Sequence, residues 1–198
     1  EFDSFFVHQI MELKKINSLV ELFFETYKEK KELTNQPFLK WLKTDKNDFL
    51  TWEQVRNNIC LFSEYLSKSL SKGDRCVLLS ENRPEWLIAD IAIMNAGGVT
   101  VPLFTTYSEK DYEYIINDCK PKICIISNDI QFKKIEKFIS SETKVISIEN
   151  FNQKIESIET ILKKNPKKET INIFENYNDK LLRKDLACII YTSGTTGN

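Results

Sequence analysis

The sequence predicts an α/β protein in which a parallel sheet carries helices on both faces. Two observations support this fold class. From residue 51 onward, the apolar residues alternate between helical spacing and short continuous runs, with brief polar breaks between them. The short runs are too brief for helices and are separated by helical patterns of about a dozen residues, which is typical of βαβ units. Right-handed crossovers are the default for such units.

The first helix and strand of this pattern occupy residues 51–79. Thr51 can cap a helix over residues 51–70. The apolar stripe of this helix consists of Val55, Ile59, Phe62, Leu66 and Leu70. A turn at Gly73 and Asp74 then leads into the apolar run 76–79, which we expect to be a buried strand.

A second helix is predicted between residues 82 and 98. Asn82 is its expected cap, Pro84 falls in the first turn, and Glu85 can return a hydrogen bond in a capping box. The helix should end at the glycine pair 97–98, because a left-handed residue is needed there. It is apolar almost all round, which indicates a position buried between two layers. Asp90 is the exception, and we interpret it as a structural carboxylate that needs a hydrogen-bond partner.

The next elements follow from the same alternation. Their predicted order is strand 99–104, helix 108–120, strand 121–127, helix 129–140 and strand 144–148. Ser108 and Asp129 are the expected caps of the two helices. Pro102 favours the end of its strand, because proline has no N–H to donate to a neighbour.

The character of the sequence changes after about residue 150. One amphipathic helix is predicted from Phe151 to about Pro166, followed by a polar connector. The basic run "KKNPKK" is expected to be a solvated loop, since no aromatic residues interleave with its lysines. The apolar run 187–191 is expected to be a core strand that leads directly into the tail.

The composition is that of an ordinary folded protein and indicates neither nucleic acid nor a membrane as a partner. The chain has 28 Lys and Arg against 29 Asp and Glu, so its overall charge indicates neither nucleic acid nor an anionic membrane as a partner. No stretch approaches the roughly 18 apolar residues of a membrane span. The cysteines lack metal-binding spacing, and we predict small core residues in a reducing compartment. They are Cys60, Cys76, Cys119, Cys124 and Cys188.

The tail of the chain has the residue types of a phosphate-binding loop. Gly194 and Gly197 let backbone N–H groups turn toward an anion. Hydroxyl donors come from Thr192, Ser193, Thr195 and Thr196. The tail follows a predicted parallel strand, and ligands gather at the carboxyl ends of such strands. Composition alone is equally compatible with an ordinary loop, and the lysine of a Walker A loop is missing.

The tail also resembles a known signature. "YTSGTTG" at residues 191–197 is similar to the phosphate-binding motif of the AMP-forming acyl- and aryl-CoA synthetases, the adenylate-forming ligases. Upstream, "LTWEQV", "KGDRCVLLSENRPEWLIADIAIMNAGGVTVPLFTT" and "YEYIINDCKPKICIIS" look like consecutive blocks of the amino-terminal subdomain of that family. Within the family, "ENRPEW" followed by "GGVTVPLF" is most similar to long-chain fatty acid–CoA ligases.

This resemblance implies a domain organisation and a reaction. Residues 1–49 would be an amino-terminal helical extension, and residues 50–198 an incomplete AMP-binding domain that ends inside the phosphate loop. The whole protein would use ATP to convert a fatty acid to an acyl-adenylate and then to acyl-CoA. The catalytic groups are expected beyond Asn198, so the chain alone is expected to be inactive.

The resemblance also implies the ligands of the tail. Around the β- and γ-phosphates of ATP it places Thr192, Ser193, Gly194, Thr195, Thr196 and Gly197. Thr195 would also help to hold Mg²⁺. The implied partners are ATP, a fatty acid and coenzyme A, without nucleic acid. The expected location is the cytoplasm, with peripheral contact to a membrane left open.

Two alternatives of a different kind remain open from the sequence. The first is an adenylating ligase for another carboxylic acid, or one that delivers the acyl group to a carrier protein. The second is a non-catalytic α/β module that binds a nucleotide or a protein partner. Acyl chain length and oligomeric state do not follow from these residues.

Overall fold

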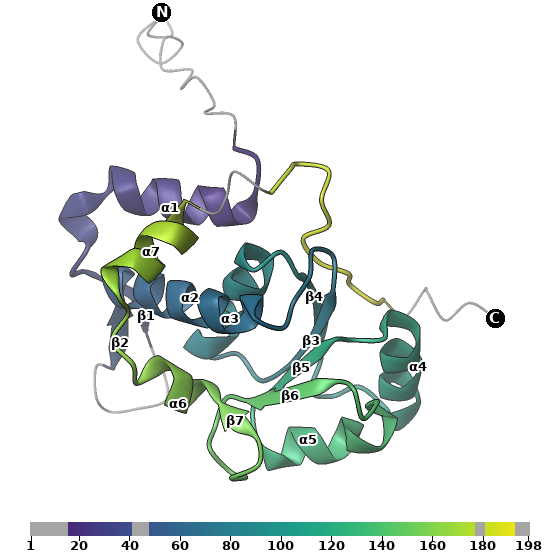
Figure 1. Cartoon of the computed structure of the whole chain (residues 1–198). Coiled ribbons are helices and arrows are strands. Elements are labelled where there is room, and N and C mark those ends of the chain that lie inside the picture. The colour runs from purple at the N-terminus through teal and green to yellow at the C-terminus, as the bar shows by residue number, and fades with distance from the viewer. Residues whose placement is uncertain (1–15, 41–47, 177–180, 193–198) are drawn as a thin grey trace, which may run out of the picture.

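The computed structural model describes residues 16–40, 48–176 and 181–192 (Figure 1). Within these ranges the centre is a five-stranded sheet in the order β4-β3-β5-β6-β7. The strands are β3 (Arg75–Leu79), β4 (Val99–Leu103), β5 (Ile123–Ile126), β6 (Lys144–Ser147) and β7 (Glu156–Ser157). Each neighbouring pair is parallel, so the predicted parallel α/β class is confirmed.

Helices cover both faces of this sheet, as predicted (Figure 1). They are α2 (Trp52–Ser67), α3 (Pro84–Asn95) and α6 (Ile158–Leu162) on one face, and α4 (Glu109–Cys119) and α5 (Asp129–Ile135) on the other. Strand side chains alternate between the faces, so Leu78 packs in the first core and Val77 in the second. Burial on both faces explains why β3 and β5 read as continuous apolar runs.

A further layer of elements packs outside α2 and α3. It contains α1 (Leu19–Glu29), the short helix Lys31–Leu33, the antiparallel pair β1 (Pro37–Lys40) and β2 (Phe49–Thr51), and α7 (Lys168–Glu175). Ala92 and Ile93 of α3 face the sheet, while Ile91 and Met94 face this outer layer. The prediction that α3 is buried between layers is therefore confirmed. The domain division between residues 49 and 50 stays a prediction, and it falls inside β2.

Two of the predicted helix caps are present. The hydroxyl of Thr51 accepts a hydrogen bond from the Gln54 backbone N–H at 3.2 Å, and the Gln54 side chain accepts one from the Thr51 N–H at 2.8 Å. Ser108 and Asp111 form the same capping box at α4. These boxes satisfy backbone N–H groups that the first helical turn leaves unpaired.

Two other predicted caps are wrong by one residue. The cap of α3 is Arg83 rather than Asn82, because Pro84 takes the first helical position, where its missing N–H costs nothing. Glu85 does not close a capping box but accepts a hydrogen bond from Arg83 Nε at 2.8 Å. The cap of α5 is Asn128 rather than Asp129, and its side chain accepts from the Gln131 N–H at 3.2 Å. A short helix, Glu136–Phe138, continues α5.

The single helix predicted over 151–166 is wrong. Glu156 and Ser157 instead extend the sheet as β7, paired with Ile146 and Ser147 of β6. The Ser157 hydroxyl then accepts from the Thr160 N–H at 3.2 Å and starts the short α6. The region expected to be a polar connector contains α7.

The strand predicted over 187–191 forms only one bridge. Thr100 of β4 donates its N–H to the Ala187 carbonyl at 3.1 Å and accepts from the Ile189 N–H at 2.9 Å. The next donor in a parallel ladder would be residue 102, which is proline and has no N–H. The ladder therefore stops. Side chains alternate in exposure along this segment, with Leu186 66% and Ile190 61% exposed. Ala187, Ile189 and Tyr191 on the other side are only partly buried, so the prediction of a core strand is wrong.

The cysteines follow the prediction with one exception. Cys60, Cys76, Cys119 and Cys124 are buried, and burial raises their pKa values, so these thiols stay protonated. Cys188 is exposed, because it lies on the uncovered side of the segment beside β4. None of the helices described is long and apolar enough to cross a membrane.

Asp90 lies half-buried on α3. Burial raises the pKa of its carboxyl, and the neighbouring Thr100 hydroxyl opposes that shift. Thr100 Oγ1 makes no hydrogen bond of ordinary length to the described part of the chain. Thr100 thus lies close to Asp90, but it does not make the hydrogen bond that the sequence predicts for this carboxylate.

Gly97 ends α3 in the left-handed conformation that the sequence predicts, with a φ of 85°. We expect Gly97→Ala to lower the free energy of unfolding by about 1 kcal/mol, because a Cβ is strained at this φ. Gly97→Asn should recover part of the loss, since asparagine tolerates the left-handed region. Urea unfolding monitored by circular dichroism measures both. Equal stability of the alanine variant and the unsubstituted protein would contradict the expectation.

Candidate functional site

The carboxyl ends of the parallel strands meet at one edge of the sheet. The chain passes from β3 to β4 on one side and then returns to β5 on the other side of β3. Such a reversal of strand order leaves a crevice outside the carboxyl ends, where open α/β sheets bind their ligands. Ser80 and Glu81 follow β3 at this edge, and Ser127 and Asn128 follow β5.

The segment before the predicted phosphate loop leads toward the same edge. Residues 186–192 run parallel to β4, joined to it at the bridge between Thr100 and Cys188. This direction carries Thr192, the first residue of the loop, toward the carboxyl ends. The side chain of Thr192 is exposed. Figure 1 shows the segment before it passing beside β4 toward α4. The other residues assigned to the triphosphate, Ser193, Gly194, Thr195, Thr196 and Gly197, lie outside the described residues. So does the magnesium ligand proposed at Thr195.

Tyr191, directly before the loop, is held at both its backbone and its side chain. Its carbonyl accepts a hydrogen bond from the Tyr107 hydroxyl at 3.0 Å. Its own hydroxyl donates to the carboxylate of Asp118, and its ring lies edge-on to Tyr114 with centroids 6.1 Å apart. Burial and the hydrogen bond to Asp118 raise the pKa of Tyr191, so the phenol keeps the proton that it donates.

Sequence reasoning missed this anchor of the loop. From the sequence, Tyr191 is expected only to be part of the motif and of a core strand. Tyr114 and Asp118 are four residues apart and share one face of α4, which was a visible signal of a common contact. Nothing local in the sequence indicates that this face meets residue 191, because the contact joins segments 73 residues apart.

A second group of polar side chains lies at the carboxyl edge. The carboxylate of Glu81 accepts from Gln131 Nε2 at 2.7 Å. Burial acts to raise the pKa of Glu81, but the neighbouring Ser127 and Gln131 side chains and Arg83 outweigh it and lower the pKa, so Glu81 is charged. Arg83 also pairs with Glu149 at 2.6 Å. Ser127 Oγ and Gln131 Oε1 are buried without a hydrogen-bond partner among the described residues.

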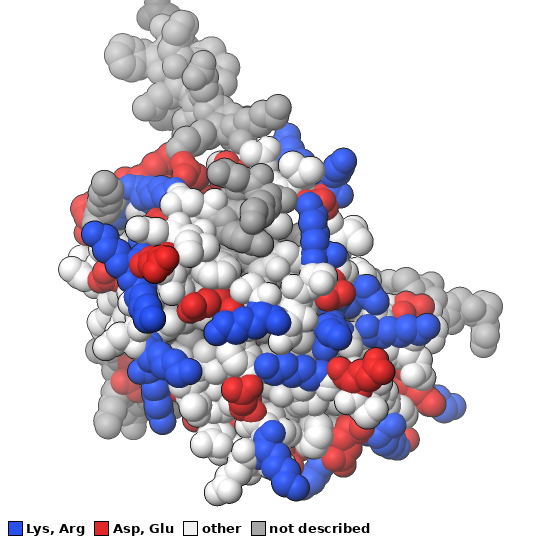
Figure 2. All heavy atoms as spheres, in the orientation of Figure 1, with Lys and Arg blue, Asp and Glu red and all other residues white. Residues whose placement is uncertain are grey.

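These polar groups do not form a metal centre by themselves. The described ranges hold no group of three or more His, Cys, Asp or Glu side chains placed to bind a metal ion. Figure 2 shows acidic and basic side chains interspersed over the visible face, without a field of one sign. The prediction for the loop does not need such a cluster, because hydroxyls and backbone N–H groups are expected to hold the phosphates.

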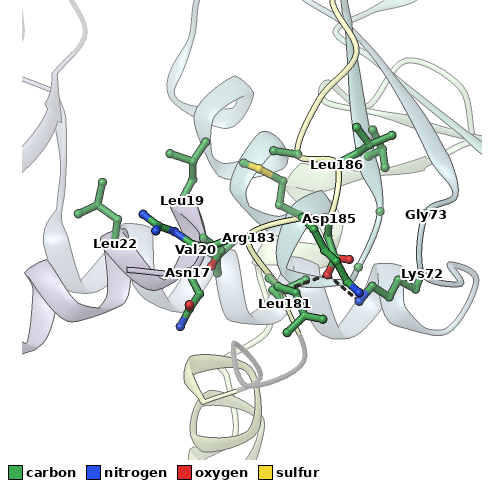
Figure 3. Close-up of a pocket in the computed structure, with 18 of the residues that line it drawn as sticks. Asn17, Leu19, Val20, Leu22, Lys72, Gly73, Leu181, Arg183, Asp185 and Leu186 are labelled. Atoms are coloured by element: carbon green, nitrogen blue, oxygen red, sulfur yellow. Dashed lines mark hydrogen bonds and ion pairs between the residues drawn. The ribbon is translucent and has the colours of Figure 1, made fainter. Parts of the chain in front are cut away.

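The cavity shown in Figure 3 lies at the opposite, amino edge of the sheet. It has a volume of about 580 Å³. It is bounded by the start of α1, by Gly73 just before β3, by Val99 at the start of β4, and by residues 181–187. Lys72 and Asp185 form an ion pair at 2.6 Å beside it. Because the segment that leads to Thr192 runs toward the other edge, this cavity is not the predicted phosphate site.

Comparison with known families places the chain. The AMP-binding enzyme family matches residues 25–198, which is most of the sequence. The chain therefore belongs to the family of AMP-binding enzymes. The match includes both the parallel sheet and the residues of the predicted phosphate loop.

Several curated proteins are similar to this chain. It is 30% identical over 146 residues to fatty acyl-CoA synthetase A of Dictyostelium discoideum, covering 69% of the chain and 21% of that protein. It is 28% identical over 170 residues to the human mitochondrial acyl-coenzyme A synthetase ACSM3, covering 82% and 28%. It is 30% identical over 145 residues to the long-chain-fatty-acid–CoA ligase ACSBG2 of Gallus gallus, covering 67% and 18%. The chain thus spans between 18% and 28% of the length of these relatives.

Solved structures share the fold at low sequence identity. The anthranilate CoA ligase AuaEII, in complex with anthranoyl-AMP, superposes with a TM-score of 0.73 at 19% identity, over 92% of this chain and 33% of that one. The N-terminal subdomain of NpsA from Klebsiella oxytoca superposes with a TM-score of 0.64 at 18% identity, over 92% and 40%. The predicted fold, that of an amino-terminal subdomain of adenylate-forming ligases, is confirmed.

Proposed function

We propose that the whole protein containing this chain is an ATP-dependent fatty acid–CoA ligase. The observation that carries the proposal is the position of Tyr191, the first residue of "YTSGTTG". It is anchored to α4 at the end of a segment that runs parallel to β4, toward the carboxyl ends of the strands. Membership of the AMP-binding family supports adenylate formation. Two of the similar proteins carry names that refer to fatty acyl or long-chain fatty acid ligation, which supports a fatty acid as the substrate.

The proposed reaction has two steps. A carboxylate oxygen of the fatty acid attacks the α-phosphorus of ATP, and the bond to pyrophosphate breaks. The thiol of coenzyme A then loses its proton and attacks the acyl carbon, and AMP leaves. The expected role of residues 192–197 is in the first step, where hydroxyl and backbone N–H donors take up the charge that develops on the leaving pyrophosphate.

The donor set of the loop suits its proposed ligands. Hydroxyl oxygens such as that of Thr195 are hard donors, which Mg²⁺ prefers, and the glycines leave backbone N–H groups open to phosphate oxygens. The ion would supply charge neutralisation of the phosphates. Within the proposal, residues 50–198 are part of the AMP-binding domain, the partners are ATP, fatty acid and coenzyme A, and the protein works in the cytoplasm.

A second substrate class is kept for a specific reason. AuaEII, an anthranilate CoA ligase, shares the fold of this chain, and at 19% identity the likeness is informative about fold alone. The alternative that the sequence leaves open is an adenylating ligase for another carboxylic acid, or one that delivers the acyl group to a carrier protein. The non-catalytic α/β module finds no such support from the comparisons.

The proposal is tested with the whole purified protein by ATP–pyrophosphate exchange. We expect exchange that depends on added fatty acid and is highest with long chains, and we expect acyl-CoA to form when coenzyme A is present. Benzoate, anthranilate and an amino acid serve as comparison substrates. Exchange with these acids alone would assign one of them as the substrate in place of a fatty acid. The absence of exchange with every acid tested would contradict the proposal.

A further inference from the structure

We infer that Tyr191 is a positioning residue for the phosphate loop and that Asp118 acts through it. The inference rests on the proposed function, because it assigns a role to the loop that begins at Thr192. In this arrangement, the phenol of Tyr191 is attached to one helix, and the attachment fixes the point from which the loop starts. Neither residue contacts the phosphates.

The platform for this attachment is α4, which is firmly held. Its capping box joins Ser108 and Asp111, and the Tyr112 side chain is 2% exposed. The Tyr112 hydroxyl donates to the Phe104 carbonyl at 2.8 Å, which ties α4 to the end of β4. A side chain that bonds to the exposed face of α4 is therefore held by this helix in a fixed position relative to the sheet.

The attachment matters because, in the described part of the chain, the backbone ladder to β4 stops before residue 191. Within the described residues, the ladder between β4 and the segment 186–192 ends at the Ile189 N–H, since Pro102 offers no further donor. Residue 191 is then located by its contacts with Tyr107, Tyr114 and Asp118. Two of these contacts act on the side chain, and one acts on the backbone carbonyl that precedes Thr192.

The chemistry of the pair favours a defined geometry. A phenol that donates to a carboxylate makes a charge-assisted hydrogen bond, which is stronger and more directional than a neutral one. The raised pKa of Tyr191 keeps the donor protonated at neutral pH. The edge-on contact with Tyr114 restricts rotation of the ring. Removing the hydroxyl should release the loop's starting point while leaving the buried core unchanged.

The test measures exchange kinetics of the whole protein with the variants Tyr191→Phe, Asp118→Ala and Asp118→Asn. We expect the KM for MgATP to rise about three- to tenfold for the first two, because an exposed charge-assisted hydrogen bond contributes in that range. The KM for the acid and the melting temperature should stay unchanged. Asp118→Asn should recover most of the effect, because the amide oxygen still accepts the hydrogen bond.

A matched control is available in Tyr65→Phe. The Tyr65 hydroxyl also donates to a carboxylate, that of Glu156, but this pair joins α2 to β7 away from the loop. The substitution Tyr65→Phe removes the same hydroxyl group and should leave the KM for MgATP unchanged. Because Tyr191 and Asp118 act through one bond, the double variant should be no worse than the single variants.

The outcomes separate the inference from the proposed function. Absence of any acid-dependent exchange in the unsubstituted protein overturns both. An active protein whose Tyr191→Phe and Asp118→Ala variants keep the original KM for MgATP overturns the inference alone. A fall in melting temperature without a kinetic change assigns the pair to stability and also overturns it. Should Tyr191→Phe fail to fold, Asp118→Ala carries the same test, since Asp118 is exposed.

Discussion

Replacing Thr195 and Thr196 together by alanine in the whole protein is expected to lower kcat/KM for MgATP by about 100-fold or more, because preorganised donors at a developing charge contribute on this scale. The proposed function assigns both hydroxyls to the triphosphate, and Thr195 also to Mg²⁺. Loss of the hydroxyls leaves the backbone donors of the glycine-containing loop in place. The residual exchange should therefore be small but measurable by radiolabelled pyrophosphate.

The control for this variant is Thr26→Ala on α1. The Thr26 hydroxyl donates to the Leu22 carbonyl of its own helix, at 2.7 Å, and lies in the outer layer. Its removal should leave the exchange kinetics unchanged. If the double variant in the loop kept the kinetic constants of the unsubstituted protein, the assignment of the loop to the triphosphate would be wrong.

Glu175→Ala is expected to lower the free energy of unfolding by about 3 kcal/mol, because it leaves a largely buried guanidinium without the carboxylate that pairs with it. Arg56 of α2 donates to the Glu175 carboxylate at the end of α7, and the two side chains are only 16% and 10% exposed. The Arg56 guanidinium also lies 5.0 Å from the Tyr27 ring centre, so the pair links three helices. Urea unfolding monitored by circular dichroism measures the loss.

Glu169→Ala is the matched control for this prediction. Glu169 lies in the first turn of the same helix, α7, and is exposed. Its replacement should change stability by less than about 0.5 kcal/mol, as is usual for exposed positions. Comparable losses for the two variants would show that the Arg56–Glu175 pair does not stabilise the fold.

Most of the fold follows from local patterns in the sequence. Runs such as residues 76–79 and 123–126 predict strands because both faces of a parallel strand are buried, so no polar residue interrupts them. Thr51 and Ser108 predict helix starts because their hydroxyls satisfy backbone groups within three residues. Such signals involve neighbours in the chain and need no knowledge of the tertiary structure.

The failures of prediction depend on contacts between distant segments. The edge strand β7 exists because Glu156 and Ser157 meet β6, and two residues are too few to leave a pattern. The strand over 187–191 is cut short by a proline 86 residues before Cys188. For the candidate site, the resemblance of "YTSGTTG" to a family motif predicts the loop, whereas the anchor through Asp118 depends on a contact between α4 and Tyr191 that no local pattern indicates.

The position of α3 between two cores has a consequence for how the protein unfolds. Its residues Ala92 and Ile93 complete the core on the sheet, and Ile91 and Met94 complete the core under α1 and α7. Helix α3 therefore borders both cores. Detachment of the outer helices would expose one side of α3 to water. We therefore expect the two cores to be energetically coupled through α3 and to unfold as one cooperative unit rather than separately.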